Sequence, residues 1–185
     1  MRWDALFADL EAQSDALDRA DRAAEVDDRS RSEFADHHLR DRLRACVGGV
    51  VRLRVAGGAT IAGTVRKVGP DWLLIDEEAS RECLVPLSAV MSVVGAGRWV
   101  ADPAADSAVA ARLGLRSALR AVARDRSGVR LLLVDGAALA ATLDRVGADF
   151  VEAAVHPVGE ARRRAAVQEV QLVAFAAIAA VRRDV

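Results

Sequence analysis

Three consecutive arginines, Arg162, Arg163 and Arg164, are the polar cluster of this chain best suited to contact a ligand. Guanidinium groups form paired hydrogen bonds with phosphates, and a protruding basic hairpin can follow the backbone of a nucleic acid. The cluster falls in a predicted hairpin with Glu160 nearby, and a solvated loop is the alternative interpretation. We take these three arginines as the candidate nucleic-acid contacts.

Catalysis, cofactor binding and metal binding have no typical signature in this sequence. The phosphate-loop, nucleophile-elbow and dinucleotide fingerprints are all missing. His37 and His38 are adjacent, so they would point in different directions on a helix, and His156 has no apparent partner. Cys46 and Cys83 are predicted to pack as small apolar groups. We therefore expect a non-enzymatic protein without a cofactor or a bound metal.

An amphipathic helix is predicted in the N-terminal arm, residues 1–30. Apolar side chains recur there at helical spacing, and acidic residues cover the other face; the apolar residues are Trp3, Leu6, Phe7, Leu10 and Leu17. Such a stripe needs an apolar surface, which the protein's own body, a second copy or another protein can supply. The first four of these residues are our candidate partner contacts.

Two parts of the chain repeat one pattern of apolar residues, glycines and turns. The aligned blocks are Val51–Leu73 with Val129–Val151, and Leu84–Val93 with Leu172–Val181. Trp72 and Phe150 match beside a turn, where an aromatic ring either fills a core or stacks on a base, and strand alternation favours the core. Matched blocks in the same order exceed the chance similarity of valine-rich strands. The pattern therefore predicts one structural unit that occurs twice.

Each unit is predicted to contain a helix followed by five short strands. Apolar and polar residues alternate in the strands, and Gly57-Gly58 and Asp135-Gly136 supply tight hairpin turns. The predicted helices cover residues 31–45 and 107–124. Five short, bent strands bury little surface as an open sheet, which favours closure into a barrel.

This order of elements resembles the Sm-like (Hfq and Sm type) family of small β-barrels, and other SH3-like barrels share it. The stretches that resemble the two Sm motifs are Val51–Ile75 and Val129–Ala153 for the first, and Leu84–Val93 and Leu172–Val181 for the second. The resemblance implies a mainly β fold of two tandem Sm-like or SH3-like five-stranded barrels, each preceded by a helix. The Asn of the family's nucleotide-binding turn is missing after Asp71 and Asp149, so the resemblance concerns the fold more than the pocket.

The predicted domains are the helical arm (1–30), a first helix with its barrel (31–97) and a second helix with its barrel (104–185). A formal net charge of −1 argues against a generic polyanion binder. The longest apolar stretch, Leu172–Val181, is too short to span a bilayer. The N-terminus lacks a secretory pattern, and two cysteines fit a reducing compartment. We expect a cytoplasmic location and no membrane partner.

Two functional hypotheses follow. The resemblance implies an RNA-associated regulatory or assembly factor. The alternative is an adaptor that binds only proteins, through the N-terminal helix or through exposed barrel edges. Because unpaired strand edges need a partner or protection, either hypothesis allows homo-oligomers.

Overall fold

The computed structural model describes residues 34–35, 37–77, 81–97, 99–101, 113–157 and 168–183. Contacts divide the chain into two compact units, Met1–His38 and Leu39–Val185. The second unit holds helices α2 (Leu39–Arg44) and α3 (Leu115–Asp125) and all the described strands. The structural statements that follow concern this described part of the second unit, unless the first is named.

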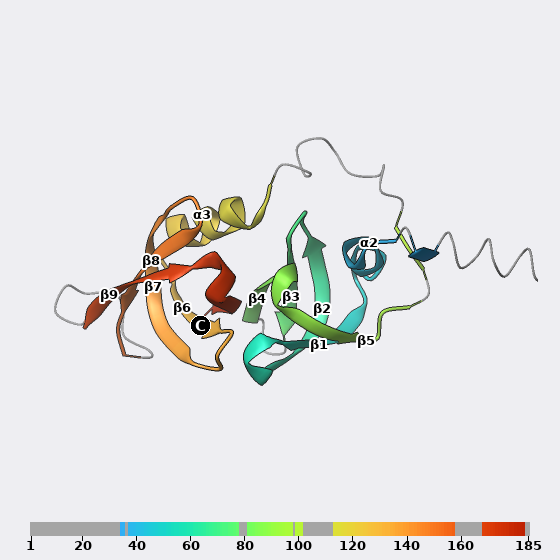
Figure 1. Ribbon diagram of the computed structural model, residues 1–185, viewed down its shortest axis with the longest axis horizontal. Helices are drawn as coiled ribbons and strands as arrows, with labels where there is room; N and C mark the ends of the chain where they lie inside the picture. The colour runs from blue at the N-terminus through green and yellow to red at the C-terminus, as the bar shows by residue number, and fades with distance from the viewer. Residues whose placement is uncertain are drawn as a thin grey trace, which may run out of the picture. The chain divides into compact units, whose positions relative to one another are not determined.

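The strands form one ten-stranded antiparallel sheet (Figure 1). The first strand group consists of β1 (Val50–Val55), β2 (Thr60–Val68), β3 (Trp72–Glu77), β4 (Arg81–Pro86) and β5 (Val90–Val94). The second strand group consists of β6 (Gly128–Leu133), β7 (Ala138–Val146), β8 (Phe150–Val155), β9 (Glu169–Ala174) and β10 (Ile178–Arg183). Across the sheet the order is β5-β1-β2-β3-β4-β10-β6-β7-β8-β9.

Local sequence explains where these strands begin and end. In β1, Val51, Leu53 and Val55 are buried whereas the intervening arginines are exposed, as the alternating pattern predicts. The first hairpin turns at Gly57 and Gly58, whose φ angles of 77° and 82° lie in the left-handed region that favours glycine. The sequence prediction of these strands and turns is confirmed.

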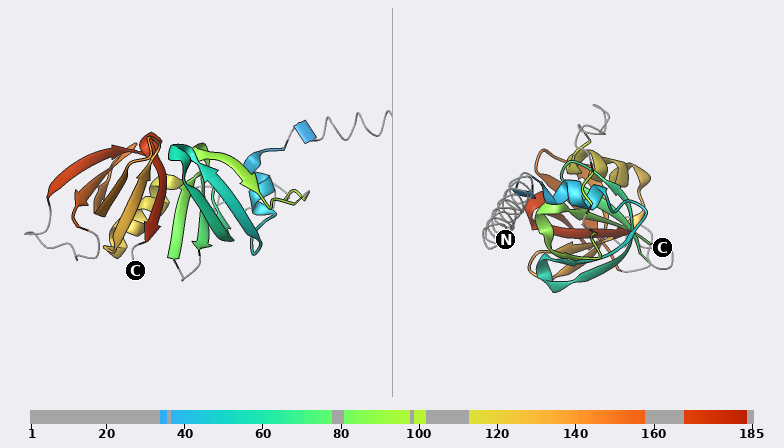
Figure 2. Two further views of the ribbon diagram at one scale, coloured as in Figure 1. Left: turned by 90° about the horizontal axis from the view of Figure 1, so that it is seen from below. Right: turned by 90° about the vertical axis from the view of Figure 1, so that its right-hand side faces the viewer.

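The two strand groups have the same strand order and the same registers. Leu53 pairs with Ile61 in the first group, and the aligned Leu131 pairs with Leu139 in the second. Both groups also have register shifts at matching places. Each position in β1–β5 therefore has an equivalent position in β6–β10. The left view of Figure 2 shows that the strands of both groups are strongly bent.

The prediction of two separate five-stranded barrels, each Sm-like or SH3-like, is wrong. The fold is mainly β, as expected, but the strands form a single open sheet. Neither group closes on itself, because β4 of the first group pairs with β10 of the second. Two groups in one chain satisfy an edge of each other, so closure is not needed to protect that edge.

The hydrophobic core consists of two clusters. One consists mainly of residues of α2 and the first group around Leu43, Leu53, Ile61 and Ile75, and it also includes Ala179 and Ala180 of β10. The other joins both groups, because it combines Trp72 and Leu84 with residues of α3 and of the second group, including Leu115, Leu119, Leu131, Leu143 and Val181. Both clusters therefore contain residues of both groups and make them one folded body.

Helix α3 is amphipathic, and its buried residues Leu115, Leu119 and Ala123 recur at the spacing of one helix face. It ends where Arg126 adopts the left-handed conformation, with φ 58°. Neither α2 nor α3 combines the length and the apolar character that a membrane crossing requires.

Candidate interaction site: the central junction and the open sheet edges

The place where β4 meets β10, which we call the central junction, holds the two strand groups together. Leu84 pairs with Val181, and Cys83 pairs with Arg182. Leu84 has 5% of its surface exposed and Val181 has 3%. This pairing turns two potential sheet edges into the interior of a continuous sheet.

Helix α3 crosses the central junction and is anchored by the turn before β3. The carboxylate Oδ1 of Asp71 accepts a hydrogen bond from the backbone N–H of Leu115 at 2.7 Å. The indole Nε1–H of Trp72 donates to the carbonyl of Leu113 at 2.7 Å. A carboxylate at this position satisfies a helix donor that has no intrahelical partner and interacts favourably with the helix dipole. The first group thus caps a helix that belongs to the second.

An ion pair reinforces the junction. Arg182 Nε and Nη2 donate to the two carboxylate oxygens of Glu77 at 2.8 and 2.9 Å, a two-pronged geometry. Burial lowers the pKa of Arg182, but the hydrogen bond and the charge of Glu77 outweigh that effect and raise it above its ordinary value. Arg182 therefore stays charged at every physiological pH.

Cys83 lies in the same row of the sheet and is fully buried. Burial, and then the negative charge of Glu77, raise the pKa of the Cys83 thiol to about 12. The thiol is therefore protonated at neutral pH and inaccessible, which is inconsistent with a nucleophile. The prediction that this cysteine packs as a small apolar group agrees with its position.

Among the described strands, β5 and β9 are the two ends of the sheet, and each has a neighbouring strand on one side only. On β9, Leu172 is 68% exposed and Val170 is also exposed. On β5, Val94 is 62% exposed and Met91 is exposed as well. A strand edge offers unpaired backbone N–H and C=O groups, and apolar side chains beside them make it a template for another strand. Sequence alternation located these strands but gave no sign that they would be the ends.

The equivalent residues at the central junction reveal how unusual this exposure is. Leu172 occupies the position of Leu84, since they pair with the equivalent residues Glu152 and Leu74. The two leucines hold the same structural position but differ in exposure, because only Leu84 has a neighbouring strand and helix that cover it. In the first group, β10 and α3 cover the surface beside Leu84. The equivalent surface beside Leu172 in the second group is not covered by any described strand or helix.

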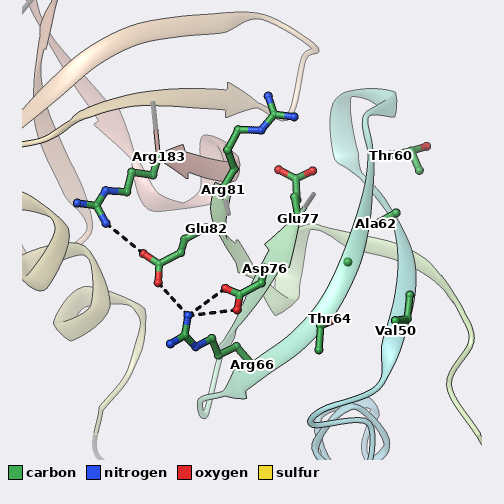
Figure 3. Close-up of a pocket in the computed structure, with 11 residues that line it drawn as sticks. Val50, Thr60, Ala62, Thr64, Arg66, Asp76, Glu77, Arg81, Glu82 and Arg183 are labelled. Carbon is green, nitrogen blue, oxygen red and sulfur yellow. Dashed lines mark hydrogen bonds and ion pairs between the residues drawn. The ribbon is translucent and has the colours of Figure 1, made fainter. Parts of the chain in front are cut away.

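A charged groove lies over the first group near the junction (Figure 3). Arg66 Nη1 contacts Asp76 at 3.1 Å and Glu82 at 3.5 Å, and Arg183 contacts the other oxygen of Glu82 at 3.6 Å. The charges of these side chains balance one another. This groove therefore offers no net attraction to an anion or a cation.

A second groove, of about 710 Å³, lies between α3 and β7 and is predominantly basic. Arg120, Arg124, Arg126 and Arg145 line it, with Asp144 as its one acidic lining residue. Arg126 is paired with Asp144 at 2.8 Å. Sequence reasoning missed this cluster, although arginines at every fourth residue from 116 to 124 predict one basic helix face.

The candidate residues taken from the sequence lie outside the described residues. They are Arg162, Arg163 and Arg164, proposed to contact nucleic acid, and Trp3, Leu6, Phe7 and Leu10, proposed to contact a partner. Their roles stay predictions. The arm of residues 1–30 and the domain boundaries drawn from the sequence stay predictions too.

His156 has a partner that the sequence did not reveal. Its Nε2 lies 3.0 Å from Thr142 Oγ1 and its Nδ1 lies 3.0 Å from the carbonyl of Pro157, and the ring is buried. Since a carbonyl only accepts, Nδ1 donates its proton to Pro157, while the threonine hydroxyl can either donate to Nε2 or accept from it. Among the described residues, no three His, Cys, Asp or Glu side chains gather closely enough to hold a metal ion.

Comparisons of the chain with protein-family models, with curated proteins and with solved structures found no match. The resemblance to the Sm-like family therefore stays a prediction.

Proposed function

We propose that this protein is a non-catalytic assembly protein, which binds protein partners by adding their strands to the open edges of its sheet. The observation that carries the proposal is the exposure of apolar side chains on both end strands, β5 and β9. Strand addition combines main-chain hydrogen bonds, which give affinity, with side-chain contacts at alternate positions, which give specificity. Both components are available at these edges.

Native proteins protect their sheet edges with charges, prolines or covering elements. On β9 the outward residues Val170 and Leu172 are apolar instead, and so is Val94 on β5. Burying one exposed leucine contributes about 2 kcal/mol. Edges of this composition favour association, and they support the adaptor hypothesis over a protein that acts alone. A cytoplasmic location remains part of the proposal.

The test is capture of partners by the tagged full chain expressed in its native cells, with and without ribonuclease. Leu172→Lys places a charge on the β9 edge, and Ala138→Lys makes the same addition at an exposed position of β7, which is paired on both sides. We expect partners that survive ribonuclease, that remain with Ala138→Lys and that are lost with Leu172→Lys. Identical captures by both variants would contradict edge binding.

RNA association is the second candidate function, and the basic groove between α3 and β7 favours it. Arg120 and Arg124 project from one helix face, where guanidinium groups can bind phosphates. Replacing both by Glu should lower affinity for mixed single-stranded RNA and flatten its salt dependence. The matched control changes Arg52 and Arg54, both exposed on β1, to Glu.

The same titration tests the arginines predicted from the sequence, by replacing Arg162, Arg163 and Arg164 together. Absence of RNA binding at low salt would remove this candidate. Equal losses in the groove and control variants would reduce the effect to overall charge.

A further inference from the structure

We infer that the partner at the open edges is a second copy of this chain, whose β5 pairs with β9 of the first in the register of the central junction. The inference rests on the proposed edge-binding function and names its partner. At the central junction Leu84 pairs with Val181, and Cys83 pairs with Arg182. The equivalent pairs between copies are Leu172 with Val93, and Gln171 with Val94.

The backbone equivalence behind this register is complete on both sides. Val93 and Val181 pair with the equivalent residues Leu53 and Leu131, so β5 and β10 hold the same place in their groups. Strands β4 and β9 likewise pair with equivalent residues of β3 and β8. The β5 strand of one copy can therefore approach β9 of another as β10 approaches β4 within the chain.

The exposed apolar residues are those that this arrangement would cover. Leu172, at the position of the buried Leu84, faces outward on β9. Leu39, the first residue of α2, holds the position that the buried Leu115 has in α3, and it is half-exposed. Leu84 and Leu115 belong to one buried cluster. In the assembly, Leu39 of the second copy joins Leu172 in the equivalent cluster.

Charge complementarity distinguishes the two junctions. Glu77 and Arg182 form the ion pair of the central junction. Val155 is the equivalent of Glu77, because their partners Ala141 and Gly63 hold the same position in β7 and β2. Val94 is likewise the equivalent of Arg182, because their partners Arg52 and Arg130 hold the same position in β1 and β6. Both members of the ion pair are thus replaced by valine, Val94 on β5 and Val155 on β8 next to the open β9 edge. A matched replacement on β5 and on β8 is expected if these two surfaces meet each other.

The same difference excludes wrong pairings. If β10 took the place of β5 against β9, Arg182 would face Val155, and an arginine without a carboxylate partner would be desolvated. If β5 replaced β10, Glu77 would lose its partner. The valine pair therefore selects β5 for β9, which gives a head-to-tail contact between copies. Such a contact produces a closed ring or a filament.

Cross-linking tests the register directly. In a Cys46→Ser background, Val94→Cys and Gln171→Cys chains are mixed and oxidised, because paired positions on antiparallel strands lie within disulfide range. We expect the disulfide-linked species in the mixture and none in either variant alone. A cross-link of Val94→Cys chains alone would mean β5 against β5, one of Gln171→Cys chains alone would mean β9 against β9, and either result overturns the inference.

A charge exchange tests the specificity. Val94→Arg and Val155→Glu, each alone, should weaken self-association about a hundredfold, since each places an unpaired charge in the contact. Mixing the two variants should restore association, because every contact then holds either an Arg–Glu or a Val–Val pair. Ala138→Arg, at an exposed position of β7, is the control that should leave association unchanged.

Light scattering on the purified full chain separates this inference from the proposed function. A wild-type chain that stays monomeric up to about 100 μM would overturn the inference that the partner is a second copy. Edge-dependent capture of another protein would in that case still support the proposed edge binding. Association that persists unchanged in Val94→Arg and Val155→Glu would also overturn the inference. Association lost in both and restored by mixing would support it.

Discussion

Replacing Trp72 by Ala should destabilise the protein far more than replacing the equivalent Phe150. Trp72 is 7% exposed and belongs to the cluster that joins the two strand groups. A buried tryptophan covers roughly 200 Å², and at about 25 cal/mol per Å² this corresponds to about 5 kcal/mol. The lost hydrogen bond to Leu113 adds about 1 kcal/mol. Part of the surface is already buried in the unfolded chain, so we expect about 4 kcal/mol.

Phe150 occupies the equivalent position but lacks the equivalent neighbours. Its ring is half-buried, no helix of the described residues covers it, and it has no N–H to donate. Truncation to Ala should therefore cost about 1–2 kcal/mol. Trp72→Phe keeps an aromatic ring and loses the indole donor, so it should fall between the two alanine variants.

Urea unfolding followed by far-ultraviolet circular dichroism measures these differences. The measurements are made in the Val94→Arg background, which we expect to keep the chain monomeric, because association would otherwise add to the apparent stability. Equal losses for Trp72→Ala and Phe150→Ala would refute the argument that the helix α3 and the central junction make the difference.

Three further predictions concern the same elements. Asp71→Ala should lower the free energy of unfolding by about 1 kcal/mol, because the cap of α3 is lost, and it should speed hydrogen exchange in the first turn of that helix. Asp71→Asn keeps an acceptor oxygen and should have a smaller effect. Exchange rates in that turn that are the same in both variants would argue against capping. Cys46, which is partly exposed, should react with iodoacetamide at neutral pH while Cys83 should not react in the folded chain, as peptide mass spectrometry can check. The folded chain holds the Cys83 proton up to about pH 12 whereas the unfolded chain releases it near 9.0, so stability should fall as pH rises through this window. Cys83→Ala should reduce that fall, and an unchanged slope would contradict the assigned cause.

Local sequence predicts the strands well because each one is determined by its own alternation and its own turns. The hairpin at Gly57 and Gly58 needs left-handed glycines, and the sequence shows them. A Cβ at Gly63 would lie 2.1 Å from the carbonyl oxygen of Asp76, so a glycine is needed where the backbones of β2 and β3 approach this closely. These features depend on residues that are near in the chain.

The connection between the groups was not predictable in the same way. Pairing of Leu84 with Val181 depends on residues far apart in the sequence, and nothing local to either strand distinguishes a neighbour in the same group from one in the other. The remote cap of α3 by Asp71 and the Thr142–His156 hydrogen bond are equally non-local. The sequence pointed to exposed edges as a binding route but not to the strands that form them: β9 and β4 look alike in sequence, and only the topology makes one an edge and the other interior.

The central junction and the open edges together explain why two similar groups in one chain need different side chains. If both junctions were identical, β10 and β5 would compete for β4, and a chain could exchange strands with its neighbours as easily as it folds. The Glu77–Arg182 pair favours the internal partner, because its loss would leave a desolvated charge on either side. Valines at positions 155 and 94 make the outer surfaces compatible with each other and incompatible with the inner ones. In the assembly that we propose, one ion pair therefore separates folding of the chain from association between copies.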